Sequence, residues 1–153
     1  MLSIFKRKQP QFFTAEEREK IVQAIQNAER RTSGEIRVHV ETHCRFVDPL
    51  DRAAEIFYSL KMDATELRNA VLVYVAMKDR QLAIFADEGI YNKAGAEFWK
   101  NQVLLMMTHF NKENYADGVV QVVQEIGEAL SSYFPFDEKI DKNELPDEIA
   151  FGK

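Results

Sequence analysis

The chain has 153 residues and a mass of 17.7 kDa, which is enough for one domain with its own core. Hydrophobic residues make up 46% of the chain, and eleven phenylalanines exclude an intrinsically disordered protein. The net charge of −5 argues against a nucleic-acid binder, the single cysteine Cys44 excludes an internal disulfide or a multi-cysteine zinc site, and no apolar run is long enough to span a membrane.

The first thirteen residues are expected to form a flexible leader. They contain the basic cluster Lys6-Arg7-Lys8, but the apolar residues precede it, and Gln9-Pro10-Gln11 interrupts the stretch that follows. A secretory signal has the opposite order, with its charges first and an apolar segment after them. We therefore expect a cytoplasmic protein.

Helical and strand periodicities alternate in the first half of the chain. Thr14-Ala15-Glu16-Glu17 matches a capping box and begins a helix that stops at Ser33-Gly34. Residues 35–43 then alternate between apolar and polar side chains, which is the pattern of a strand. Asp48-Pro49 opens a second helix with an apolar stripe that extends to Leu60.

The second half predicts a hairpin followed by two long helices. Residues 71–75 are apolar on both faces, as in a central strand, and residues 81–86 form the next strand after a short charged turn. Apolar helical patterns cover about 95–110 and 117–133. Because a helix connects the first two strands, we expect them to be parallel, with the third antiparallel. The prediction is an α/β fold, a three-layer α/β/α sandwich on a small mixed β-sheet.

The last segment, residues 135–153, is predicted to be an acidic, mobile tail. It contains six acidic and three basic residues, a composition suited to a solvated chain end. The predicted organisation is therefore a leader over 1–13, one domain over 14–134 and the tail over 135–153.

The predicted topology places three polar segments at one edge of the sheet. The start of the first strand carries Ser33-Gly34-Glu35, the approach to the second carries Met62–Asn69, and the end of the third carries Asp87-Glu88-Gly89. Carboxylate, amide and hydroxyl oxygens at this density suit Ca²⁺, or Mg²⁺ with more retained water. The alternative is that these acids are simply solvated loop residues.

Two other groups of residues suggest metal or nucleophilic chemistry at the opposite edge. His43, Cys44, Asp48 and Asp79 gather there, but neighbouring strand residues point to opposite faces, which argues against a Cys–His catalytic pair. The sequence His39-Val40-Glu41-Thr42-His43 has two histidines four residues apart, a spacing that suits zinc only on a helix. We therefore expect structural roles for both groups.

The order of these motifs resembles a known family. Residues 33–38 after a helix, then 69–75, then 84–90 are together similar to the TPM domain, over about residues 12–134. That family includes a thylakoid-lumen acid phosphatase, a photosystem II repair protein and many bacterial proteins. The closest likeness is to small stand-alone TPM proteins of marine, cold-living flavobacteria.

The resemblance implies an α/β/α sandwich with a Ca²⁺ site at the acidic edge. The positions that match are Glu35, Asp63, Thr65, Asn69, Asp87 and Glu88. On this hypothesis Ca²⁺ orders the loops 61–69 and 87–95, and Mg²⁺ is the other candidate cation.

Two other functions stay open at this point. One is a metal-assisted phosphomonoesterase, with Asp63 or Asp87 as nucleophile or base and Arg37 or Arg68 holding phosphate oxygens. The other is a protein-interaction domain with a structural metal and an unknown protein partner.

Overall fold

The computed structural model describes residues 12–137 and 150–151. Most of the flexible leader predicted over 1–13 and most of the predicted acidic tail therefore lie outside the described residues. The elements are α1 Ala15–Glu29, β1 Glu35–Glu41, α2 Pro49–Ser59, η2 Met62–Ala64, β2 Ala70–Ala76, β3 Gln81–Ala86, α3 Glu88–Ala94, α4 Ala96–Asn111, α5 Tyr115–Tyr133 and β4 Ala150–Phe151.

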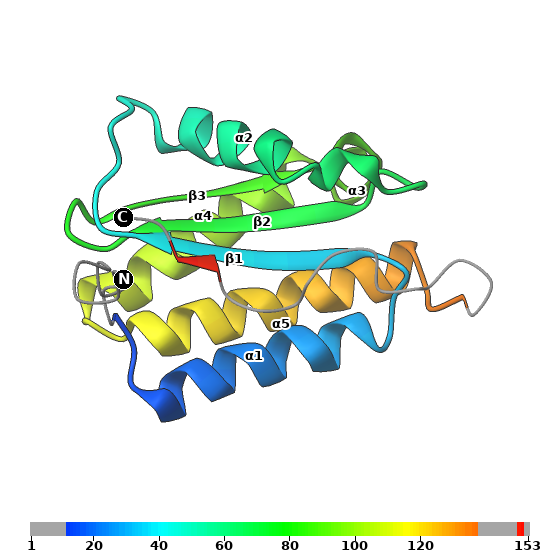
Figure 1. The fold of residues 1–153 in the computed structure, drawn as a ribbon. Helices are drawn as coiled ribbons and strands as arrows, with labels where there is room; N and C mark the ends of the chain where they lie inside the picture. The colour runs from blue at the N-terminus through cyan, green and yellow to red at the C-terminus, as the bar shows by residue number, and fades with distance from the viewer. Residues whose placement is uncertain (1–11, 138–149, 152–153) are drawn as a thin grey trace, which may run out of the picture.

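The sheet has the strand order β3-β2-β1-β4 (Figure 1). β1 is parallel to β2, with Glu35 opposite Ala70, and β2 is antiparallel to β3, with Val71 opposite Ala86. Both pairings confirm the topology predicted from the order of the elements. The short β4 was not predicted; it pairs in parallel with β1, where Ala150 lies opposite His39.

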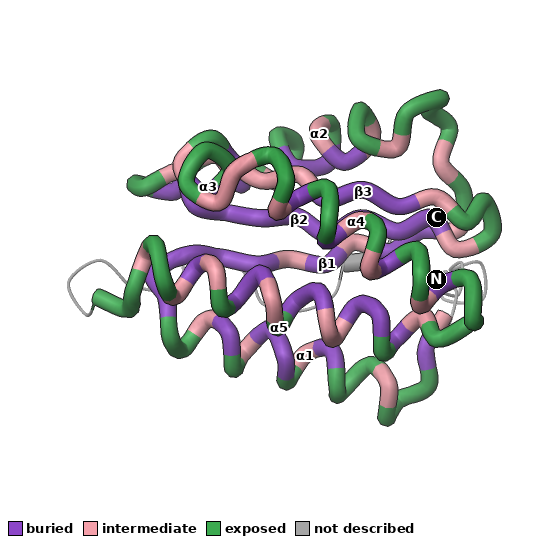
Figure 2. The backbone as a smooth tube through the Cα atoms, turned by 180° about the vertical axis from the view of Figure 1, so that it is seen from behind, coloured by how far each residue is buried: buried purple, intermediate pink, exposed green. Residues whose placement is uncertain are grey.

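Helices cover the two faces of the sheet unequally (Figure 1). On one face, α2 packs through Phe57 against β2 and β3. On the other face, α1, α4 and α5 surround a larger core that includes Ile36, Val73 and Ile126. Figure 2 shows the buried backbone concentrated along the strands and on the helix sides that face them. These two cores confirm the predicted three-layer α/β/α sandwich.

The segment after β3 differs from the prediction. Residues 87–95 were expected to be a loop, but residues 88–94 form the helix α3. The carboxylate of Asp87 accepts a hydrogen bond from the Glu88 amide and caps this helix, and Gly95, where φ is +89°, follows its last residue. Asp87-Glu88-Gly89 therefore both ends a strand and begins a helix.

Candidate functional site at the acidic edge of the sheet

Backbone hydrogen bonds bring together the three segments that the sequence placed at one edge. The amide of Glu35 donates to the carbonyl of Asn69 at 3.3 Å, and the amide of Asp87 donates to the carbonyl of Ala70 at 2.9 Å. The starts of β1 and β2 and the end of β3 are thus direct neighbours. The predicted convergence of these segments is confirmed at the level of the backbone.

An ion pair with Arg68 dominates the side chains of this edge. Arg68 donates from Nε to Oδ2 of Asp87 at 2.7 Å and from Nη2 to Oδ1 at 2.9 Å, while its Nη1 lies 3.2 Å from Oε1 of Glu88. Asp87 is buried, whereas the Arg68 side chain is 38% exposed. The pKa of Arg68 is raised, first by the hydrogen bond to Asp87 and then by the charges of Asp87, Glu88 and Asp63.

The backbone around Arg68 fits closely against the first turn of α3. Arg68 has a φ of +52°, and its carbonyl accepts from the Ile90 amide at 3.3 Å. A Cβ added to Gly89 would lie 2.3 Å from the Leu67 carbonyl oxygen and 2.5 Å from that of Arg68. Only glycine fits this approach, so the position of the guanidinium beside Asp87 depends on Gly89.

Two of the predicted ligands instead hold the loop before β2 together. Thr65 accepts through Oγ1 from the Asn69 amide at 3.3 Å, and Nδ2 of Asn69 donates to Oγ of Ser33 at 3.3 Å. Thr65, Asn69 and Glu35 are all buried, with at most 4% of each exposed. Asp63 lies in η2 and is partly exposed. The polar side chains of this edge thus divide into a buried layer of Glu35, Thr65 and Asn69 and an acidic group around Arg68, which includes the buried Asp87 and the exposed Glu88.

Asp63, Asp87 and Glu88 offer carboxylate oxygens, which are the kind of ligand that Ca²⁺ and Mg²⁺ prefer. Among the residues that the structure describes, however, no three His, Cys, Asp or Glu side chains are placed to hold a metal ion. Both oxygens of Asp87 accept from Arg68. The positive charge that these acids share in the structure is thus the protein's own guanidinium, a role for Arg68 that sequence reasoning missed.

At the opposite edge, the residues singled out in the sequence have structural roles. Asp79 accepts from the Cys44 amide at 2.7 Å and lies 3.0 Å from Nδ1 of His43. Asp48 caps α2 by accepting from the Leu50 amide at 2.9 Å. These contacts join the loop after β1 to the turn between β2 and β3.

A buried ionic network occupies the α2 side of β1, where the sequence raised the question of zinc. Glu41 accepts from Nε and Nη2 of Arg52, at 2.9 and 2.8 Å, and from the Tyr74 hydroxyl. The pKa of Glu41 is lowered because the Arg52 and Tyr74 hydrogen bonds outweigh desolvation by burial. Since Glu41 is already committed to three donors, this network supports the predicted structural role. Sequence reasoning missed Arg52 and Tyr74 as partners of Glu41, because they lie on α2 and β2.

His39 lies beside that network with its ring stacked on Tyr74, at 6.2 Å between centroids. Both ring nitrogens are buried and lack a hydrogen-bond partner among the described residues. Burial lowers the pKa of His39, and the positive charges of Arg52 and Arg37 lower it further against the opposing charge of Glu41.

The fold and the site define the class of this protein as an α/β/α sandwich with an acidic sheet edge. The starts of two parallel strands and the end of a third form that edge. The model of the TPM domain matches residues 7–129, and the chain belongs to the TPM domain family. The resemblance identified from the sequence is thereby confirmed.

Two solved structures share the fold. The NMR structure of the BA42 protein of the psychrophilic bacterium Bizionia argentinensis is 42% identical, with a TM-score of 0.85 over 95% of this chain and 99% of that one. The N-terminal domain of the cg2496 protein of Corynebacterium glutamicum is 14% identical, with a TM-score of 0.64 over 79% of this chain and 76% of that one, and shows the fold alone. A comparison with curated proteins gives no match. Within the described residues, none of the helices has the length and apolar character needed to cross a bilayer.

Proposed function

We propose that this TPM domain binds a divalent cation, Ca²⁺ in preference to Mg²⁺, at the acidic group around Arg68, which consists of Asp63, Asp87 and Glu88. The observation that carries the proposal is that Asp87 and Glu88 both pair with the guanidinium of Arg68, whose pKa is raised further by the negative charge of Asp63. Carboxylates that converge in this way repel one another unless a positive charge lies among them. Ca²⁺ accepts irregular sets of oxygen ligands, whereas Mg²⁺ demands near-octahedral geometry.

A cation can bind to these carboxylates only if Arg68 leaves them. Its side chain is 38% exposed, so it can leave Asp87 for solvent without crossing the core. A bound divalent cation would supply positive charge in place of the guanidinium, with Asp63, Asp87 and Glu88 as the residues that hold it. Arg68 and the cation therefore compete for the same carboxylates, and the apparent affinity for Ca²⁺ includes the cost of displacing Arg68.

The exchange would act on the junction between two segments. In the Arg68 form, the guanidinium ties the loop before β2 to the cap of α3. When Arg68 is released, the bound cation would link the loop before β2 to the cap of α3 in its place. The Arg68 guanidinium would then be exposed at the surface. The role that we propose for the cation is to order residues 61–69 against the start of α3.

The test is a Ca²⁺ titration followed by NMR, with Mg²⁺ in parallel, on the wild type and on Arg68→Ala. Saturable shifts confined to residues 62–69 and 87–89 are expected, with affinity about two- to five-fold higher in Arg68→Ala because the competing ion pair is gone. Asp63→Asn with Asp87→Asn should abolish the shifts. Glu66→Gln, an exposed residue of the same loop, is the matched control.

Absence of saturable shifts in both the wild type and Arg68→Ala would overturn the proposal. Equal affinity in the two would retain the site but remove Arg68 as a competitor. The phosphatase and interaction-domain hypotheses stay as the sequence left them, since no contact at this edge favours either one.

A further inference from the structure

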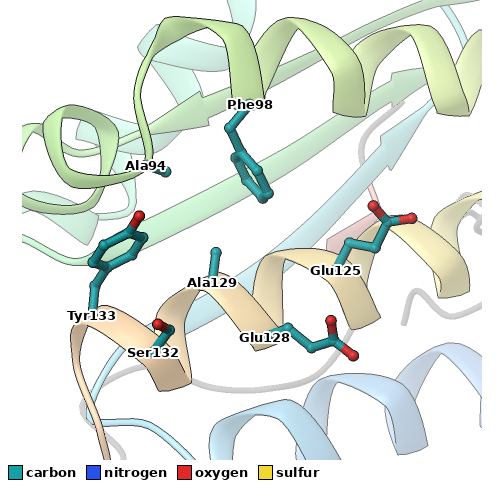
Figure 3. Close-up of a pocket in the computed structure, with 7 residues that line it drawn as sticks. All are labelled: Ala94, Phe98, Glu125, Glu128, Ala129, Ser132 and Tyr133. Atoms are coloured by element: carbon teal, nitrogen blue, oxygen red, sulfur yellow. The ribbon is translucent and has the colours of Figure 1, made fainter.

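A groove lies on the other side of the molecule from α2, between the start of α4 and the second half of α5. It has a volume of about 320 Å³ and is shown in Figure 3. Phe98 points from α4 into the space opposite Ala129, and Tyr133 lies at one end. The lining residues are Ala94, Phe98, Glu125, Glu128, Ala129, Ser132 and Tyr133.

The lining combines aromatic rings with carboxylates and contains no cationic residue. One oxygen of Glu125 accepts from Nε2 of Gln102 at 3.2 Å. Glu128 is exposed, and within the described part of the chain its carboxylate takes part in no hydrogen bond or ion pair. Lys93, which precedes Ala94, lies over the Phe134 ring at 6.0 Å. Among the described residues, Lys93 therefore forms no ion pair with Glu125 or Glu128.

We propose that this groove receives an arginine side chain from a basic segment of a partner protein. A guanidinium has a planar face that stacks on aromatic rings and an edge that donates to carboxylates. The groove offers both, with Phe98 and Tyr133 as the aromatic surfaces and Glu128 and Glu125 as the acceptors. A volume of about 320 Å³ is at the lower end for ligand pockets, which suits one side chain better than a large cofactor.

The small residues Ala94 and Ala129 line the space that the apolar stem of an arginine would occupy. Between the two aromatic rings they leave open space rather than a filled core (Figure 3). The arginine stem can therefore lie along apolar surface while its head reaches the carboxylates at the rim. The residues that line this groove are different from the carboxylates and Arg68 of the acidic edge.

The experiment is an NMR titration of the whole protein with N-acetyl-arginine methylamide. The matched probe is the citrulline amide, which has the same shape without the charge, and a third arm uses the lysine amide. Saturable shifts at residues 94–98 and 125–133 with the arginine amide, and none with the citrulline amide, are the expected result. Equal binding of the lysine amide would overturn the preference for a guanidinium.

Variants separate charge from stacking. Glu128→Gln should weaken binding of the arginine amide about two- to five-fold, the range of an exposed ion pair. Glu19→Gln on α1 makes the same change of charge away from the groove and should leave binding unchanged. Phe98→Leu should weaken binding about two- to five-fold through loss of the cation–π contact. Absence of saturable shifts up to the solubility limit of the arginine amide, or binding unchanged in Glu128→Gln and Phe98→Leu, overturns the proposal.

Discussion

Arg68 and Asp87 are joined by two parallel hydrogen bonds, at 2.7 and 2.9 Å, that link the loop before β2 to the cap of α3. The pair is asymmetric in exposure, since the carboxylate is buried and the guanidinium is more than one third exposed. The guanidinium therefore lies between the buried carboxylate of Asp87 and solvent. The proposed exchange of Arg68 for a divalent cation depends on that asymmetry.

Gly89→Ala should disturb this edge without changing its charge. The new Cβ would meet two backbone carbonyl oxygens, at 2.3 and 2.5 Å, so the loop at 67–68 must shift. We expect a loss of about 2–3 kcal/mol in the free energy of unfolding, measured by urea denaturation. Asn92→Ala, at an exposed position of the same helix, should stay within about 0.5 kcal/mol of the wild type. Similar effects of the two substitutions would contradict the close approach at Gly89.

The network around Glu41 should contribute strongly to stability. Glu41→Gln leaves Arg52 with only the exposed Glu55 as a charged partner. We expect a loss of about 2–4 kcal/mol in the free energy of unfolding, reduced from the fully buried case because Arg52 is 26% exposed. Tyr74→Phe should cost about 1–2 kcal/mol through the lost hydrogen bond. The double variant should lose less than the sum, because both residues belong to one network.

Glu55→Gln is the control for that experiment, since it removes the exposed acidic partner of the same arginine. It should cost less than about 1 kcal/mol, the usual range of a surface ion pair. Additive effects of Glu41→Gln and Tyr74→Phe in denaturation experiments would show that the two contacts act separately.

His39 should make the protein less stable as the pH falls. Its pKa in the folded state is below 6.5 because burial disfavours the charged ring. The unfolded chain therefore takes up this proton at a higher pH than the folded one, so stability is full above 6.5 and falls as the pH drops toward the folded pKa. His39→Gln should flatten this part of the pH profile of the free energy of unfolding. Parallel profiles for the two proteins would contradict the assignment.

The periodicity of the sequence was sufficient to predict the layers and strand pairings. Val38 and Val40 alternate with polar neighbours on β1, and Val71–Val75 is apolar on both parities, so both patterns identify strands and the second identifies a central strand covered on both faces. These features depend only on local spacing. The short helix α3 was missed because seven residues that contain Gly89 carry too little of a helical pattern.

Side-chain partnerships were the part that the sequence did not reveal. Arg68 reaches Asp87 across 19 positions, and Tyr74 reaches Glu41 across 33. The pairing of Arg68 with Asp87 depends on the left-handed backbone at Arg68, and the pairing of Tyr74 with Glu41 depends on the register of β1 against β2. The edge was therefore predictable as a gathering of acids, while the guanidinium at its centre emerges only from the three-dimensional arrangement.

Gly127 and Ala28 determine how closely α5 approaches α1. A Cβ at Gly127 would lie 2.5 Å from the Ala28 Cβ, so Gly127→Ala should cost about 1–2 kcal/mol although alanine is the better helix former. Ala28→Gly removes the opposing methyl group. Gly127→Ala should therefore be at least about 1 kcal/mol less costly in the Ala28→Gly background than in the wild type, because the 2.5 Å contact is gone while the helix preference of alanine remains. Gln124→Ala, on the exposed side of α5, controls for helix propensity. If Gly127→Ala costs the same in both backgrounds, the two helices do not meet at this pair.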